Sequence, residues 1–266
     1  MIDSHVHLNR GEFADDRVEV LGRARAAGVK GFLNVGYDPA TSRESLELAR
    51  EHPDVLATVG VHPHDATLLA DETGVVTAAG REILAELADL ASAAEVVAIG
   101  EIGLDYYRDL SPRRAQHAAL AVQLELAGRL GLPVVFHVRD AWDDILPAID
   151  RIGIPDRGGV LHSFSGGPEA VVWARERGFL LGIGGPVTYK NSRLPDLVAS
   201  AGADLLLLET DAPWLPPVPH RGRRNESGYL GFTRDKLAEV LDLEPAEVDR
   251  RTTASFGRLF GPAGFG

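Results

Sequence analysis

Residues 1–9 read MIDSHVHLN, a short apolar stretch that carries two histidines, His5 and His7, on either side of a valine. Ile2–Val6 is predicted to form a β-strand, and alternate residues of a strand point to the same side, so both imidazoles face one way. Two imidazoles in a protein interior need polar partners, and a divalent cation would satisfy both. The alternative is a pair of histidines hydrogen-bonded within a polar layer.

Short apolar runs alternate with longer amphipathic runs along the rest of the chain. The predicted strands are Ile2–Val6, Gly31–Val35, Val55–Val61, Val96–Glu101, Pro133–His137, Gly159–His162, Phe179–Ile183 and Leu205–Glu209. The predicted helices are Asp15–Ala27, Ala40–Glu51, Ala79–Ala93, Pro112–Leu130, Ala141–Ile152, Pro168–Glu176, Leu194–Ala199, Thr233–Leu241 and Pro245–Phe260. Alternation of this kind predicts an α/β protein with a (β/α)8 TIM barrel, residues 1–266 forming a single domain. An open doubly wound sheet is the alternative, although no GxGxxG pattern supports its dinucleotide-binding form.

The composition limits the class of protein. A length of 266 residues suits one barrel, and the absence of cysteine excludes disulfides and thiolate metal sites. No apolar run reaches the roughly 20 residues of a membrane span, and no signal peptide is evident, so a cytoplasmic location is expected. The formal net charge of −12 means that a nucleic-acid substrate would need a local basic patch or a cation.

Histidines and carboxylates gather at the ends of at least five predicted strands. They are His5, His7, His62, His64, Glu101, Asp105, His137, His162, Glu209 and Asp211. Active sites of (β/α)8 barrels lie at the carboxyl ends of the strands, so these side chains are expected to meet there. A single histidine is more often a satisfied core residue than a ligand, but this repeated placement predicts a metal site.

The motifs around these residues carry a resemblance. They are DSHVHL, GVHPH, GEIGLDYY, FHVRDA, LHSFSGG, VTYKN, LLLETDAPWL and RRNE, in this order between residues 3 and 226. The sequence resembles the TatD family of metal-dependent hydrolases, a branch of the amidohydrolase-like barrels. The resemblance implies a two-metal barrel that hydrolyses phosphodiesters and acts as a deoxyribonuclease. Asn9, Ser163 and Ser227 depart from the family pattern, and none of them is an expected ligand.

The resemblance also implies a division of the ligands. His5, His7 and Asp211 would hold one divalent cation, and His137 and His162 would hold the second. Glu101 would bridge the two, since a carboxylate has two oxygens and can span cations about 3.5–4 Å apart. Asp211 would also accept a proton from the attacking water. The metal could be Mg, Mn or Zn, with imidazole-rich ligation less suited to Mg.

A second set of residues could contact the substrate, each with a structural alternative. His62 could touch a phosphate or cap a loop, and Asp105 could orient a ligand or cap a turn. The remaining candidates are Arg139 and Lys190 as phosphate contacts, Trp214 and Tyr189 as stacking partners for a base, and Arg223 and Arg224 as a phosphate clamp. Both arginines belong to the basic stretch 220–224, and the alternative interpretation of this stretch is a solvated loop without a binding role.

Three classes of function remain open at this stage. A metal-dependent nuclease acting on DNA, with cleavage from a 3′ end as one mode, is the favoured interpretation. A hydrolase of small esters, lactones or amides, or an aminoacyl deacylase, would use the same cations and suit the acidic surface. A non-catalytic metal-binding protein is the third class, and the complete ligand set argues against it. We expect a monomer.

Overall fold

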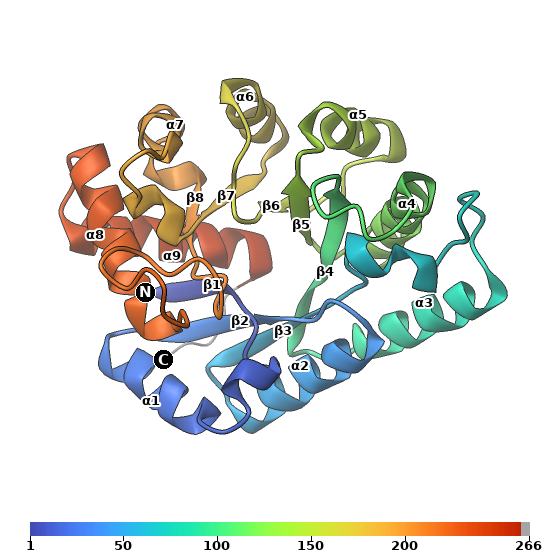
Figure 1. The fold of residues 1–266 in the computed structure, drawn as a ribbon, viewed down its shortest axis with the longest axis horizontal. Helices are drawn as coiled ribbons and strands as arrows, with labels where there is room; N and C mark the ends of the chain where they lie inside the picture. Colours follow the sequence, from blue (N-terminus) through green and yellow to red (C-terminus); the bar gives the residue numbers. More distant parts are fainter. Residues whose placement is uncertain (262–266) are drawn as a thin grey trace.

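The computed structural model describes residues 1–261; the predicted domain, 1–266, ends in a segment, 262–266, outside the described residues. Eight parallel strands follow one another in chain order around a nearly closed barrel (Figure 1). The strands are β1 (Ile2–Val6), β2 (Gly31–Val35), β3 (Val55–Val59), β4 (Val96–Asp105), β5 (Val134–Arg139), β6 (Gly159–Leu161), β7 (Leu180–Ile183) and β8 (Leu206–Leu208). The predicted (β/α)8 barrel is therefore confirmed, and the open doubly wound sheet is wrong.

Helices form the outer layer around the strands (Figure 1). The α-helices are α1 (Arg17–Ala26), α2 (Pro39–Glu51), α3 (Ala78–Leu90), α4 (Arg113–Leu130), α5 (Trp142–Ile152), α6 (Pro168–Arg177), α7 (Leu194–Ala201), α8 (Leu230–Leu241) and α9 (Pro245–Phe260). Gly131 and Gly178 end α4 and α6 in the left-handed conformation, which glycine adopts without steric cost. None of the helices in residues 1–261 is long and apolar enough to cross a membrane.

The barrel closes through the segments that follow β1 and β8. The Asp211 N–H donates to the His5 carbonyl at 2.9 Å, and the His7 N–H donates to the Ala212 carbonyl at 3.0 Å. The buried Asp3 carboxylate accepts from the backbone N–H and the hydroxyl of Thr210. Burial raises the pKa of Asp3 to about 7 despite these hydrogen bonds. The closure therefore brings the DSHVH and ETDAP stretches side by side.

Several strand ends differ from the predicted ones. β3 stops at Val59, whereas β4 continues past Glu101 to Asp105 because it pairs with β5 as far as Arg139. Gly103 permits this pairing, since a Cβ atom there would lie 1.9 Å from the His137 carbonyl oxygen. The extension makes Asp105 the last residue of β4, whereas the sequence-based alternative placed it at the cap of a turn.

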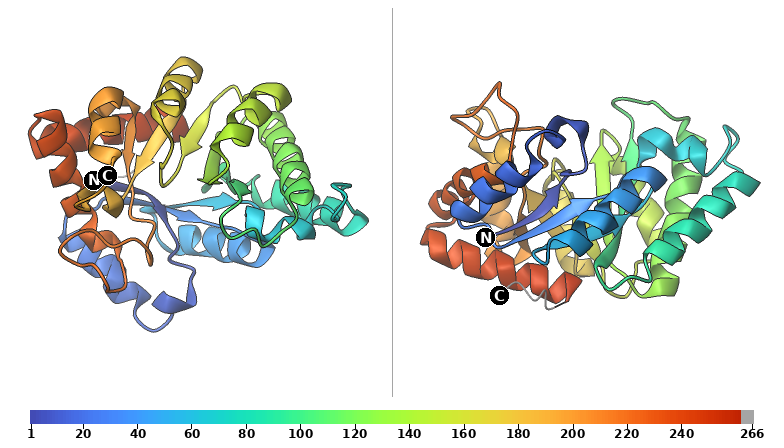
Figure 2. Two further views of the ribbon diagram at one scale, coloured as in Figure 1. Left: turned by 45° about the horizontal axis from the view of Figure 1, so that its top comes forward. Right: turned by 90° about the horizontal axis from the view of Figure 1, so that it is seen from below.

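An apolar plug fills the barrel interior below the polar side chains. Ile2, Leu33, Leu56, Ala98, Val135, Val160, Leu180 and Leu207, one from each strand, form it with Phe256, Leu259 and Phe260 of α9. The helix α9 packs against β1 and β8, and Figure 2 shows it running beneath the strands. The polar side chains at the carboxyl ends of the strands therefore lie above a mostly buried apolar layer.

Phe256→Ala should lower the free energy of unfolding by about 3–5 kcal/mol, because it opens a cavity in this layer. Phe256 is 1% exposed, whereas Phe232 is 40% exposed and serves as the matched control. Chemical denaturation of both variants measures the difference. An equal, small effect of the two substitutions would contradict the plug.

Candidate metal centre

Polar side chains from five strand ends converge at the top of the barrel. β1 supplies His5, and His7 follows it; β4 supplies Glu101, and β5 supplies His137. His162 follows β6 directly, and Asp211 follows β8. His5, His7, Glu101 and His162 are at most 5% exposed. The structure thus brings together all six residues predicted as ligands.

Glu101 lies between two groups of imidazoles. Its Oε2 atom is 3.6 Å from His5 Nε2 and 3.8 Å from His7 Nε2. Its Oε1 atom is 2.8 Å from His137 Nδ1 and 3.0 Å from His162 Nε2. Each carboxylate oxygen therefore faces a different set of nitrogen donors.

The His5 and His7 side chains fit a shared cation. Their Nε2 atoms are 3.1 Å apart, and Asp211 Oδ1 lies 3.9 and 3.6 Å from them. Two ligand atoms on one cation at about 2.1 Å would be separated by about 3.0–3.4 Å. The Nδ1 atoms of both histidines are buried without a hydrogen-bond partner among the described residues. The fit to a cation therefore rests on the Nε2 atoms, which lie close together and face Asp211 and Glu101.

The carboxylates of the centre remain ionised. Burial alone would raise the pKa of Glu101, but His162, His62 and His137 hold it well below its usual value. Burial alone would also raise the pKa of Asp211, but the hydrogen bond with His7 and the nearby His162 and His5 together lower it. Buried anions of this kind need compensating positive charge, which protonated histidines or divalent cations can supply.

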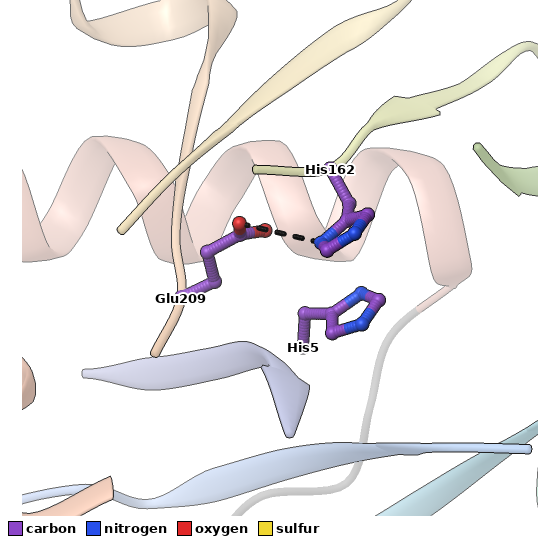
Figure 3. A group of neighbouring side chains, drawn as sticks. All are labelled: His5, His162 and Glu209. Atoms are coloured by element: carbon purple, nitrogen blue, oxygen red, sulfur yellow. Dashed lines mark ion pairs between the residues drawn. The ribbon is translucent and has the colours of Figure 1, made fainter. Parts of the chain in front are cut away.

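Glu209 supports His162 from the β8 side (Figure 3). Its Oε1 atom accepts the Ser163 N–H at 2.6 Å and lies 3.6 Å from His162 Nδ1. The His162 ring stacks on the His5 ring with centroids 3.7 Å apart. Gly182 leaves the necessary room, since a Cβ atom there would lie 2.0 Å from Glu209 Oε2. Glu209 was expected among the strand-end side chains that meet at the metal site, but its contact with His162 was not predicted.

His62 is directed at the same carboxylate but presents a different chemistry. Its Nε2 atom lies 3.6 Å from Glu101 Oε1, and its Nδ1 atom accepts the His64 N–H at 3.1 Å. Burial, followed by the nearby His137, lowers the pKa of His62 well below its usual value. The neutral ring then carries its proton on Nε2, which makes His62 a hydrogen-bond donor toward the centre.

Asp105 connects His137, one of the two imidazoles at Glu101 Oε1, to His64 in the loop after β3. Its Oδ2 atom lies 3.1 Å from His137 Nε2 and 2.8 Å from His64 Nε2. Its Oδ1 atom accepts the N–H groups of Tyr107 and Arg108. Asp105 therefore fixes the orientation of His137, one of the two roles considered for it, and the turn contacts provide the other.

The remaining predicted substrate contacts have different surroundings. Trp214 is 41% exposed, and its ring centroid is 5.1 Å from that of His7. The Arg139 guanidinium lies over the Tyr107 ring, and Lys190 is exposed. Arg224, by contrast, is held in an ion pair with Asp16 at 2.6 Å. Contact of these residues with a substrate stays a prediction.

The fold and this centre define a metal-dependent hydrolase of the (β/α)8 barrel class. The family model for TatD related DNase matches residues 2–261, and the chain belongs to this family. The chain is 36% identical over 261 residues to the uncharacterized metal-dependent hydrolase YabD of Bacillus subtilis, with 98% of both chains covered. It is 37% identical over 268 residues to the 3′-5′ ssDNA/RNA exonuclease TatD of Salmonella typhimurium, again with 98% of both covered.

A solved structure of a TatD homologue supports the same family membership. The TatD homologue YJJV from Escherichia coli superposes with a TM-score of 0.88 at 30% identity, covering 98% of this chain and 97% of that one.

Glu101→Gln should lower the number of bound divalent cations, because the neutral amide cannot serve two ligand groups with two anionic oxygens. Elemental analysis after loading with Mn²⁺ and gel filtration measures the stoichiometry. Glu125→Gln, at an exposed position on α4, is the matched control. Unchanged metal content in the Glu101 variant would contradict the shared-ligand arrangement.

Proposed function

We propose that the protein is a divalent-metal-dependent nuclease that removes nucleotides from the 3′ end of single-stranded DNA or RNA. The observation that carries the proposal is the position of Glu101, whose two oxygens face separate imidazole groups. Two cations held on either side of one carboxylate suit phosphodiester hydrolysis, because they stabilise both the attacking and the leaving oxygen. The names of relatives such as the Salmonella TatD exonuclease support the substrate and the direction.

In this proposal the ligands divide as the family resemblance implies. His5, His7 and Asp211 would hold one cation, His137 and His162 would hold the other, and Glu101 would be shared. The bound cations would polarise the phosphoryl group and lower the pKa of a water molecule. A mixed set of imidazoles and carboxylates suits Mn and Zn better than Mg.

The side chains of the chain itself supply the proton transfers. Asp211 is ionised and partly accessible, with a side-chain exposure of 14%, so it can accept a proton from the attacking water. His62 donates its Nε2–H to a phosphoryl oxygen. Asp105 and Glu209 act as positioning residues, because they hold His137 and His162 in place.

A second candidate function uses the same centre on a small molecule. Attack on an ester, lactone, amide or aminoacyl carbonyl needs the same activated water, and the net charge of −12 favours a small substrate over a polyanion. Under either function we propose a monomer that is located in the cytoplasm.

The protein stripped with a chelator should regain cleavage of 5′-labelled single-stranded oligonucleotides on addition of Mn²⁺, Mg²⁺ or Zn²⁺. A ladder that shortens by one nucleotide at a time from the 3′ end is expected. His137→Ala serves as the control for contaminating nucleases. Absence of cleavage with every metal, by protein shown to bind two ions, would favour the small-molecule hydrolase.

Asp211→Asn should lower kcat by about 10²–10⁴-fold, because the amide cannot accept the proton. KM should change far less if Asp211 acts mainly in the chemical step. Steady-state kinetics at saturating Mn²⁺ measure both constants. A variant that retains wild-type kcat would exclude Asp211 as the general base.

A further inference from the structure

The loops around the metal centre differ sharply in charge. After β1, β2 and β3, residues 7–16, 36–38 and 60–77 contain seven carboxylates and one arginine. After β7 and β8, residues 184–193 and 209–226 contain five cations and three carboxylates. Glu209 and Asp211 belong to the metal centre, and Glu226 pairs with Arg23. In a chain with 39 acidic and 27 basic residues, this concentration of positive charge at one side of the mouth is unusual.

Most of these cations lack an anionic partner. The side chains of Lys190, Arg193 and Arg223 are exposed and form no ion pair or hydrogen bond within residues 1–261. Arg221 lies over the Tyr189 ring at 4.0 Å from its centroid. Arg224 alone is neutralised by Asp16, so it is the weakest candidate for a contact with a polyanion.

Two hollows lie among these cations and meet at Tyr189 and Ser192. The larger, about 480 Å³, begins beside Ser163, the neighbour of His162, and has Arg139 and Arg193 at its edge. Its walls include the apolar side chains of Phe164, Leu194, Leu197 and Leu215. The smaller, about 290 Å³, is lined by Tyr189, Lys190, Asn191, Ser192 and Arg221.

We propose that these hollows and the cations around them form a track that holds single-stranded polynucleotide as it leaves the metal centre over the loops after β7 and β8. The inference rests on the proposed nuclease function and assigns the side of the mouth on which the uncleaved strand lies. The apolar walls suit the faces of a base, and the unpaired cations suit the phosphates that follow it.

The Tyr189 side chain has a positioning role in the track. Its hydroxyl donates to the Pro216 carbonyl at 3.0 Å, which ties the loop after β7 to the loop after β8. Because the ring lines both hollows, it can stack on a base between them. The acidic loop after β3, which lies across the barrel from β7, repels the strand and favours the path over the loops after β7 and β8.

Binding without catalysis tests the track directly. Fluorescence anisotropy would measure the affinity of the metal-stripped protein for a labelled oligothymidylate of about 12 nucleotides. The NaCl concentration would be varied between about 25 and about 200 mM, because phosphate contacts make the affinity depend steeply on salt in this range. Lys190→Ala/Arg221→Ala should bind roughly tenfold more weakly at low salt. Its slope of log affinity against log salt should be shallower by about 1.4, or about 0.7 per lost contact.

The matched control removes two exposed cations at the other end of the barrel. Lys30→Ala/Arg50→Ala changes the net charge by the same amount, since Lys30 precedes β2 and Arg50 lies in the last turn of α2. It should bind like the wild type. Equal weakening by both double variants would show a general charge effect and overturn the track, as would wild-type binding by Lys190→Ala/Arg221→Ala.

A second pair of variants tests the stacking contact. Tyr189→Ala should weaken binding by roughly fivefold to a hundredfold, whereas Tyr189→Phe, which keeps the ring, should restore most of the affinity. Equal loss in both variants would contradict stacking. Absence of oligonucleotide binding by the wild type at low salt contradicts the track, whereas binding without cleavage under any metal contradicts the proposed nuclease.

Discussion

The structure depends on one carboxylate, Glu101, that is held between two groups of histidines inside a barrel. An ionised carboxylate at 3% exposure is costly unless nearby positive charge compensates it. The barrel provides that compensation by directing His5, His137 and His162 at its two oxygens from three different strand ends. The apolar plug formed with α9 lies below the centre, and most of its members are buried.

The fold and the ligand positions could be predicted because both follow from local patterns. Apolar strands alternating with amphipathic helices define the barrel, and a barrel brings the carboxyl ends of all strands together. The end of β4 could not be predicted, because pairing with β5 rather than local sequence decides it. The Arg224–Asp16 ion pair joins residues 208 positions apart, so no local pattern could indicate that this part of the clamp is neutralised. The orientation of Glu209 toward His162 depends on room left by Gly182, which is likewise a tertiary effect.

The charge distribution reconciles the acidic chain with the polyanionic substrate that we propose. The net charge of −12 describes the whole surface, whereas a strand bound at the mouth senses charges within about a Debye length, or about 8–10 Å. The loops after β7 and β8 carry five cations, and their three carboxylates are taken up by the metal centre or, for Glu226, by an ion pair with Arg23. Local charge therefore favours one path for a nucleic acid, and the acidic remainder disfavours non-specific binding elsewhere.

The most direct test of the two-cation centre is the anomalous scattering of crystals of the Mn²⁺-loaded protein. The account predicts two peaks about 3.5–4 Å apart, one beside His5, His7 and Asp211 and the other beside His137 and His162, with Glu101 between them. A single peak, or two peaks that do not share Glu101, would contradict the account.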